Sequence, residues 1–251
     1  MELKYSSHSS LKVNTPNVAL LPWGATEAHN QHLPYGSDII QSEVIAKTAA
    51  EAANSKGAKS IVLPVIPFGN NAQHLDQIAA IHLNTTTAYS ILKDVSYSLL
   101  KQGIDRLIIV NSHGGNDFKP LVRDIQSELK VLIILADLHK MIPDVVGELF
   151  DTPGDHAGEL ETSMMMYLLN DDVDISKAGE GKRTKFKIKG LNQAGVWTPR
   201  PWKLSHPDLG SGNPENANID KGKIYFEKLT EALSTVVLDL SIAVKGDLPY
   251  I

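Results

Sequence analysis

The chain has 251 residues, of which 42% are hydrophobic, 21% charged and 6% aromatic, and this balance is typical of a globular protein with a sizeable core. Its net charge of -5 argues against a broad binding surface for nucleic acid or for an anionic membrane. Because the chain has no cysteine, disulfides, thiolate nucleophiles and cysteine metal sites are excluded. His, Asp and Glu remain as the candidate metal ligands.

The sequence gives no sign of targeting or of division into parts. Residues 1–12 lack the pattern of a signal peptide, and no stretch reaches the roughly 18 apolar residues that cross a bilayer. We therefore expect a cytoplasmic protein with a small-molecule partner. Since no repeat, low-complexity tract or linker is visible, we expect one domain over residues 1–251.

Strand and helix patterns alternate along the chain. Apolar runs rich in Val, Ile and Leu predict buried strands at Val18–Leu21, Ile61–Ile66, Leu107–Val110 and Val131–Ala136. Helical spacing between them predicts helices over Ser37–Asn54, Thr85–Gln102 and Asp117–Leu129. This alternation predicts an α/β protein, a three-layer α/β/α sandwich with a mainly parallel sheet. In such sheets, ligands bind beyond the carboxyl ends of the strands.

A first polar cluster follows the predicted strand that ends at Leu21. Glu27 and His29 are two residues apart, so in an extended segment both side chains point the same way, as ligands of neighbouring metal ions would. Asp38 lies beside the start of the next predicted helix. His32 belongs to the same segment, and a hydrogen bond that supports a ligand explains it better than metal binding does.

A second polar cluster, Asn111–Asn116, follows the predicted strand that ends at Val110. It presents His113 at the carboxyl end of that strand. Gly114 and Gly115 allow the backbone to turn sharply and to approach a ligand closely.

A third candidate comes from the helical pattern within Asp155–Leu168. Its core-facing stripe runs through Ala157, Leu160 and Met164, and Glu161 falls inside this stripe, whereas Glu159 is expected on the solvated face. An unpaired buried carboxylate costs several kcal/mol. Glu161 therefore needs either a cation or a proton.

Together, segments 22–38, 111–116 and 155–163 resemble the creatininase (creatinine amidohydrolase) family, and the likeness extends from Val18 to the helix near Glu227. The resemblance implies a three-layer α/β/α fold, a homo-oligomer that is often a hexamer, and a two-metal centre that hydrolyses an amide-type C–N bond. It also implies residue roles: His156 lies near the reacting centre, and the metal ligands are Glu27, His29, His113, Glu161 and the bridging Asp38.

Two departures from creatininase proper argue against creatinine as the substrate. Creatininase has a glutamate where this chain has Gly115, so the fifth ligand must come from elsewhere, and Glu161 is the candidate. Creatininase also closes its pocket with tryptophans, whereas no Trp lies between His113 and His156. The pattern is more similar to family members such as a formamidopyrimidine deformylase and a peptide-trimming enzyme of cofactor biosynthesis.

The expected reaction is metal-dependent hydrolysis of a cyclic amide, a formamide or a small peptide-like substrate. Two divalent ions would lower the pKa of a shared water from about 15.7 toward 7 and so produce hydroxide. We expect one ion to be held by Glu27, Asp38 and His113, and the other by His29, Asp38 and Glu161.

The remaining roles are less constrained by the sequence. His156 is expected to pass a proton to the leaving nitrogen, although its position after Asp155 also suits a helix cap. Zinc is the default metal for such ligands, and manganese or iron also fits the oxygen-rich set. The alternative function is a non-catalytic protein that holds metal and binds a small molecule. Neither a Gly-x-Ser-x-Gly elbow nor a Gly-x-Gly-x-x-Gly turn is present, so serine hydrolases and dinucleotide-binding dehydrogenases fit poorly.

Several other residues keep two interpretations each. His74 lies on a loop where a pocket-lining and a structural role are equally compatible with the sequence. Residues Trp197–Trp202 suit a mobile lid or a subunit contact. The alternation from Thr184 to Ile188, within the basic stretch Lys182–Lys189, predicts a half-exposed strand. The other histidines are interpreted as surface or hydrogen-bonded core groups: His8, His82, His139 and His206.

Overall fold

A four-stranded sheet forms the centre of the protein, in the order β2-β1-β3-β4 with every neighbouring pair parallel. The computed structural model describes residues 1–244, and of Asn170 only the backbone; residues 245–251, which the single-domain prediction includes, lie outside that range. The strands are β1 (Val18–Trp23), β2 (Ser60–Val62), β3 (Arg106–Asn111) and β4 (Leu132–Asp137). The predicted parallel sheet is confirmed. The strand predicted over Ile61–Ile66 ends early, at Val62, although Leu63 and Ile66 still donate backbone N–H groups to β1.

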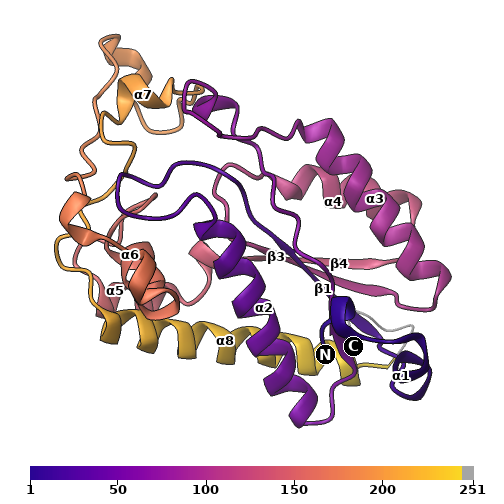
Figure 1. Ribbon diagram of the computed structural model, residues 1–251. Helices are drawn as coiled ribbons and strands as arrows, with labels where there is room; N and C mark the ends of the chain where they lie inside the picture. The colour runs from indigo at the N-terminus through magenta and orange to yellow at the C-terminus, as the bar shows by residue number, and fades with distance from the viewer. Residues whose placement is uncertain (245–251) are drawn as a thin grey trace.

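Helices cover both faces of the sheet, with α2 and α8 on one face and α3 and α4 on the other (Figure 1). The helices are α1 (His8–Val13), α2 (Ser37–Ser55), α3 (Thr85–Lys101), α4 (Phe118–Glu128), α5 (Pro143–Leu149), α6 (Glu159–Leu168), α7 (Trp202–Ser205) and α8 (Ile219–Ile242). Short 3-10 turns are η1 (Leu3–Tyr5), η2 (Ala72–His74), η3 (Leu138–Lys140), η4 (Asn170–Asp172), η5 (Ile175–Lys177) and η6 (Lys189–Asn192). The predicted three-layer α/β/α sandwich is confirmed.

Two hydrophobic cores explain why the strands are apolar without a polar face. Successive side chains of a strand point to opposite faces. Accordingly, Leu20 and Ile108 pack with the core under α2 and α8, whereas Leu21 and Ile109 pack with the core under α3 and α4. Burial on both faces turns β1 and β3 into continuous apolar runs, which is the pattern that a parallel sheet requires.

The strand predicted within Lys182–Lys189 is wrong. This segment is irregular and leads into η6. Its backbone hydrogen bonds go elsewhere: the Thr184 N–H donates to Ser205 O at 2.7 Å, and the Phe186 N–H donates to the Asn192 side chain at 3.0 Å. Alternation in the sequence supplies no partner strand, and without a partner the segment forms no ladder.

The sheet register places the predicted polar clusters side by side. Trp23 at the end of β1 lies opposite Asn111 at the end of β3. The chain segments that follow both strands therefore leave the sheet at the same edge. None of the helices within residues 1–244 is long and apolar enough to cross a membrane.

Candidate metal centre and active site

Six predicted site residues come together at the carboxyl ends of β1 and β3, and all six are buried. They come from separate parts of the chain: the segment after β1, the first turn of α2, the segment after β3, and the loop and first turn of α6. In that order they are Glu27 and His29, Asp38, His113, and then His156 and Glu161.

The first group of candidate ligands is Glu27, Asp38 and His113, whose nearest ligand atoms all lie within 4.8 Å of one another. His113 Nδ1 is 3.0 Å from Glu27 Oε1 and 3.1 Å from Asp38 Oδ2. His113 Nε2 bonds to the backbone carbonyl of Asn70 at 3.1 Å, which leaves Nδ1 to face the carboxylates. Burial lowers the pKa of His113, but Glu27 and Asp38 outweigh this effect and raise the pKa well above its ordinary value.

The second group is His29, Asp38 and Glu161. His29 Nε2 is 3.3 Å from Asp38 Oδ1 and 3.5 Å from Glu161 Oε1. Burial raises the pKa of Glu161, yet the neighbouring His29 outweighs it and holds the pKa well below its ordinary value. Asp38 therefore belongs to both groups and offers a different oxygen to each histidine.

His156 and His74 complete the site on the side of Glu27. His156 Nδ1 is 3.7 Å from Glu27 Oε1, and His156 Nε2 bonds to the backbone carbonyl of Ala28 at 2.8 Å. That second contact assigns the proton to Nε2 and leaves Nδ1 toward the site. His74 Nδ1 is 3.0 Å from Glu27 Oε2, so the pocket-lining interpretation of His74 is the one that the structure favours. Burial lowers the pKa of His74 to about 4.

The structure explains why this chain has glycine where creatininase proper has a ligand. A Cβ on Gly115 would lie 2.5 Å from Asn70 O and 2.5 Å from His113 Nε2. A larger side chain cannot occupy position 115 while His113 keeps its place. Glu161 instead reaches the site from α6, and its Oε2 accepts a hydrogen bond from the Ala157 N–H at 2.7 Å.

The expectation that Glu159 faces solvent is wrong. Glu159 is fully buried, and its carboxylate accepts hydrogen bonds from Lys221 Nζ at 2.5 Å and from the Thr152 N–H at 2.9 Å. Helix α8 covers the face of α6 that the pattern assigns to water. Glu159 and Glu161 are therefore both buried, but only Glu159 has a lysine partner.

Two polar residues support the site. Gln41 Nε2 donates to Glu161 Oε1 at 2.9 Å, and His32 Nε2 bonds to Thr162 Oγ1 at 2.8 Å. Burial lowers the pKa of His32 to about 4 and outweighs the opposing effect of Glu161. The sequence analysis missed Gln41, although its spacing from Asp38 puts both on one face of α2 and gives a usable signal.

A cavity of 480 Å³ opens onto Glu27, His74, His113 and His156. Trp202, which is 4% exposed, forms part of its wall and stacks on His74 with ring centroids 4.4 Å apart. Trp202 therefore belongs to the site, and the two interpretations of residues 197–202, a mobile lid or a subunit contact, stay predictions. His206, expected on the surface or in the core, is buried behind it and stacks on the same indole at 3.9 Å.

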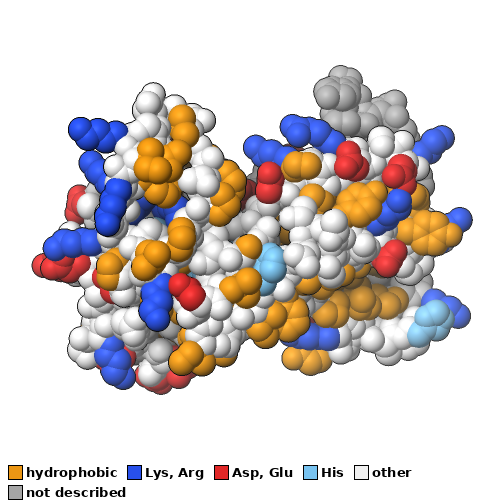
Figure 2. Space-filling model, turned by 90° about the horizontal axis from the view of Figure 1, so that it is seen from above, with side chains coloured by type: hydrophobic (Ala, Val, Ile, Leu, Met, Phe, Trp, Pro, Cys, Tyr) orange, Lys and Arg blue, Asp and Glu red, His pale blue; other side chains and the backbone are white. Residues whose placement is uncertain are grey.

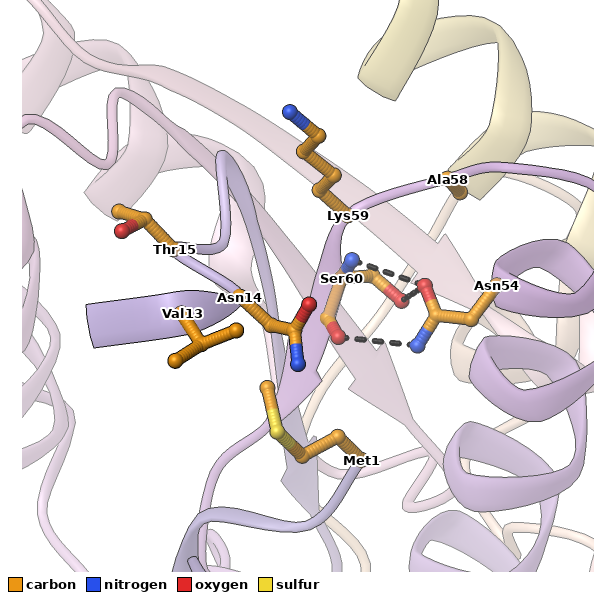
Figure 3. A pocket seen from close by; sticks show the side chains of 8 residues that line it. All are labelled: Met1, Val13, Asn14, Thr15, Asn54, Ala58, Lys59 and Ser60. Atoms are coloured by element: carbon orange, nitrogen blue, oxygen red, sulfur yellow. Dashed lines mark hydrogen bonds between the residues drawn. The ribbon is translucent and has the colours of Figure 1, made fainter. Parts of the chain in front are cut away.

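A larger cavity of 510 Å³ lies at the opposite end of the sheet, near the start of β2 (Figure 3). It is lined by Met1, Val13, Asn14, Thr15, Asn54, Ala58, Lys59 and Ser60. No acid or histidine is among these residues. The Asn54 amide is already paired with the Ser60 backbone at 2.9 and 3.0 Å. Of these two cavities, the one at the carboxyl ends of the strands is the one lined by carboxylates and histidines.

The family model for creatininase, described as creatinine amidohydrolase, matches residues 3–237. The match spans all of the elements that carry the candidate ligands. This chain belongs to the creatininase family. As a creatininase-family member it is an amidohydrolase, an enzyme that hydrolyses C–N bonds with the help of metal.

Three relatives illustrate the breadth of the creatininase family around this chain. The crystal structure of a candidate creatinine amidohydrolase from Bacteroides fragilis is 36% identical, has a TM-score of 0.90, and the match covers 98% of each chain. The mycofactocin precursor peptide peptidase of Mycobacterium ulcerans is 25% identical over 92% of this chain and 88% of the relative. A 2-amino-5-formylamino-6-ribosylaminopyrimidin-4(3H)-one 5'-monophosphate deformylase of Methanobrevibacter smithii is 23% identical over 95% and 96%.

Proposed function

We propose that this protein is a binuclear metal-dependent amidohydrolase of a small amide, with Asp38 as the carboxylate shared by two ions. The proposal rests on two carboxylate oxygens that lie close to imidazole nitrogens but are not hydrogen-bonded to them. Asp38 Oδ2 and Glu27 Oε2 are each about 3 Å from an imidazole nitrogen, yet both are buried and accept no hydrogen bond. Nitrogen and oxygen atoms that approach one another without hydrogen-bond geometry suit ligands arranged around a common cation.

The donor set fits divalent metal ions. Glu27, Asp38 and His113 would hold one ion, and Asp38, His29 and Glu161 the other. Three buried carboxylates and two imidazoles suit zinc, and the oxygen-rich set also accepts manganese or iron. When bound, the ions supply Lewis acidity toward the substrate carbonyl and toward water.

The protein's own residues position the ligands and move the proton. Gln41 and the Ala157 N–H fix both oxygens of Glu161, and Asn70 O fixes the ring of His113. His156 faces the cavity with Nδ1, and its Nε2 is held by Ala28 O. We propose that Nδ1 accepts the proton that the attacking water gives up and passes it to the leaving nitrogen, because a histidine shuttle needs one free nitrogen and one fixed nitrogen.

The substrate is proposed to be a small amide that enters the 480 Å³ cavity. The names of the relatives point to a formamide or a peptide-like amide as much as to a cyclic amide.

We further propose a homo-oligomer. Figure 2 shows separate groups of hydrophobic side chains on both sides of a notch, and the side chains of Ile78 and Leu204 are 90% and 75% exposed. Light scattering on the purified protein tests the assembly.

Elemental analysis combined with a hydrolysis panel tests the function. We expect two equivalents of metal per chain, and metal-dependent turnover of at least one class among lactams, formamides and short peptides. Chelation should abolish turnover, and zinc or manganese should restore it. His156→Gln should keep both ions and lower kcat by about 10² to 10⁴-fold, as expected for a lost proton-transfer group.

Two results would change the proposal. Loss of an ion in His156→Gln would make His156 a ligand, which its place in a third group with Glu27 and His29 also allows geometrically. Tight binding of the panel compounds by the metal-loaded protein, without release of amine or carboxylate, would instead support a metal-holding binding protein.

A further inference from the structure

Arg200 lines the same cavity as Glu27, His113 and His156, and two contacts fix its position. Its backbone N–H donates to Gln73 Oε1 at 3.0 Å, and its guanidinium lies over the Trp202 ring, 5.1 Å from the centroid. Trp202 is itself stacked between His74 and His206. The guanidinium therefore makes a cation–π contact with Trp202 beside the proposed metal centre.

The charge of Arg200 has one weak counter-ion within residues 1–244. The nearest carboxylate oxygen, Asp155 Oδ2, is 3.9 Å away, and the Asp155 side chain is 60% exposed. The Arg200 side chain is only 18% exposed. Its other polar neighbour is His206 Nε2 at 3.5 Å, and burial together with Arg200 lowers the pKa of His206 to about 4, so this ring is neutral at pH 7. A largely buried guanidinium with only a weak, exposed counter-ion thus lines the cavity, and most of its N–H donors are open to a ligand.

Arg200 is also the single Lys or Arg side chain among the residues that line this cavity. The carboxylates that line the cavity are Glu27, Asp117 and Asp155, so Arg200 adds a positive charge to an otherwise acidic wall. A guanidinium binds a planar carboxylate through two parallel hydrogen bonds, which fixes orientation as well as position. The cavity therefore combines candidate metal ligands, which would bind the scissile amide, with a guanidinium that suits an anionic group.

We propose that Arg200 binds a carboxylate of the substrate, so that the substrate class is an amide bearing a free carboxylate, such as an N-acyl amino acid, a carboxylated lactam or a short peptide end. The inference rests on the proposed function and specifies its substrate. A carboxylate fits better than a phosphate monoester, because Asp117 and Asp155 line the same cavity and repel a dianion more strongly than a monoanion.

Binding measured by tryptophan fluorescence tests the inference, since Trp202 and Trp197 both line the cavity. The probes are N-acetylglycine and its neutral counterpart N-acetylglycinamide, titrated into the metal-loaded protein. We expect wild type to prefer the carboxylate probe by at least about tenfold, as one charge-assisted pair provides. Arg200→Gln should lose that preference while its Kd for the amide probe stays unchanged. Arg200→Lys should retain part of the preference.

Lys203→Gln is the matched control, because Lys203 lies exposed on α7, three residues away, and does not line the cavity. It should bind both probes as wild type does. A carboxylate preference that survives in Arg200→Gln would overturn the inference and assign the anion to the metal ions. Tighter, Arg200-dependent binding of N-acetylethanolamine phosphate would overturn the choice of carboxylate, and equal binding of both probes by wild type would overturn the subsite altogether.

The two proposals fail in different ways. Failure of the hydrolysis panel with an intact, Arg200-dependent carboxylate preference contradicts the proposed function alone. Turnover of neutral amides with no carboxylate preference contradicts the Arg200 subsite alone.

Discussion

Replacing Gly24 by alanine should displace the shared ligand Asp38 without changing any ligand. Gly24 follows β1 and packs directly against the backbone at the start of α2. A Cβ at position 24 would lie 2.7 Å from both Asp38 C and Ile39 N, whereas ordinary contact begins at 3.4 Å. The start of α2 must therefore retreat by about 0.7 Å, the difference between these distances.

That displacement exceeds what a metal site tolerates, since ligand distances stay within about 0.2 Å of their ideal values. Because Asp38 belongs to both candidate groups, both ions should be affected. We expect the affinity for each ion to fall by on the order of 10- to 100-fold, the cost typical of disturbed ligand support. Titration with a competing chelator, read by elemental analysis, measures the change.

Gly36→Ala is the matched control for Gly24→Ala. Gly36 caps the same helix, and a Cβ there meets only Ile40 Cδ1 at 3.8 Å, an ordinary contact. It should bind both ions as wild type does. Thermal unfolding of both variants checks that they remain folded. If Gly24→Ala bound two ions with wild-type affinity, the placement of Asp38 by close backbone packing, and with it the shared-ligand proposal, would be refuted.

Three further predictions follow from buried contacts. By elemental analysis, Glu161→Gln should lose one of the two ions. Glu159→Gln is the control and should keep both, because the Glu159 carboxylate pairs with Lys221. If both variants kept two ions, Glu161 would not be a metal ligand. Burial raises the pKa of Glu159, but Lys221 and Thr152 outweigh it and hold the pKa below its ordinary 4.5. The stabilising effect of Glu159 should thus be present above pH 4.5 and disappear as pH falls through the lower folded-state pKa, so the Tm difference between wild type and Glu159→Gln should shrink in acid; a constant difference contradicts this. Gly222→Ala, where a Cβ clashes with the Ser163 carbonyl, should destabilise the α6–α8 contact by about 3 kcal/mol or more in urea unfolding, whereas Gly147→Ala on α5, where a Cβ meets nothing within 4 Å, should not destabilise.

The layers of the fold follow from local sequence because burial on both faces leaves a direct mark on a strand. The apolar runs at β1 and β3 and the helical spacing of α2 were sufficient to predict parallel βαβ units. The predictions were wrong where the outcome depends on a neighbouring strand or helix that the local sequence does not indicate. The alternation at Lys182–Lys189 found no neighbouring strand, and Glu159 was assigned to solvent because nothing in α6 indicates that α8 covers it.

Some residues of the candidate site could be predicted from local motifs, and others are brought together only by the fold. Glu27, His29, Asp38 and His113 occupy short motifs directly after strands or at a helix start, so the sequence indicated both their grouping and their edge of the sheet. His74 and Trp202 do not share a motif with those ligands, and only the folded chain brings them against Glu27 and His156. Cytoplasmic location and a single domain over residues 1–251 stay predictions.

By itself, the sequence determined an α/β sandwich with a carboxylate- and imidazole-rich edge, because periodicity and strand-end motifs are local properties. The tertiary structure decided which groups have partners: Glu159 pairs with Lys221, Glu161 faces His29, and Arg200 lies over Trp202 with the exposed Asp155 3.9 Å away. Pairing of charges such as Glu159 with Lys221 depends on distances between residues far apart in the chain, and folding alone sets those distances.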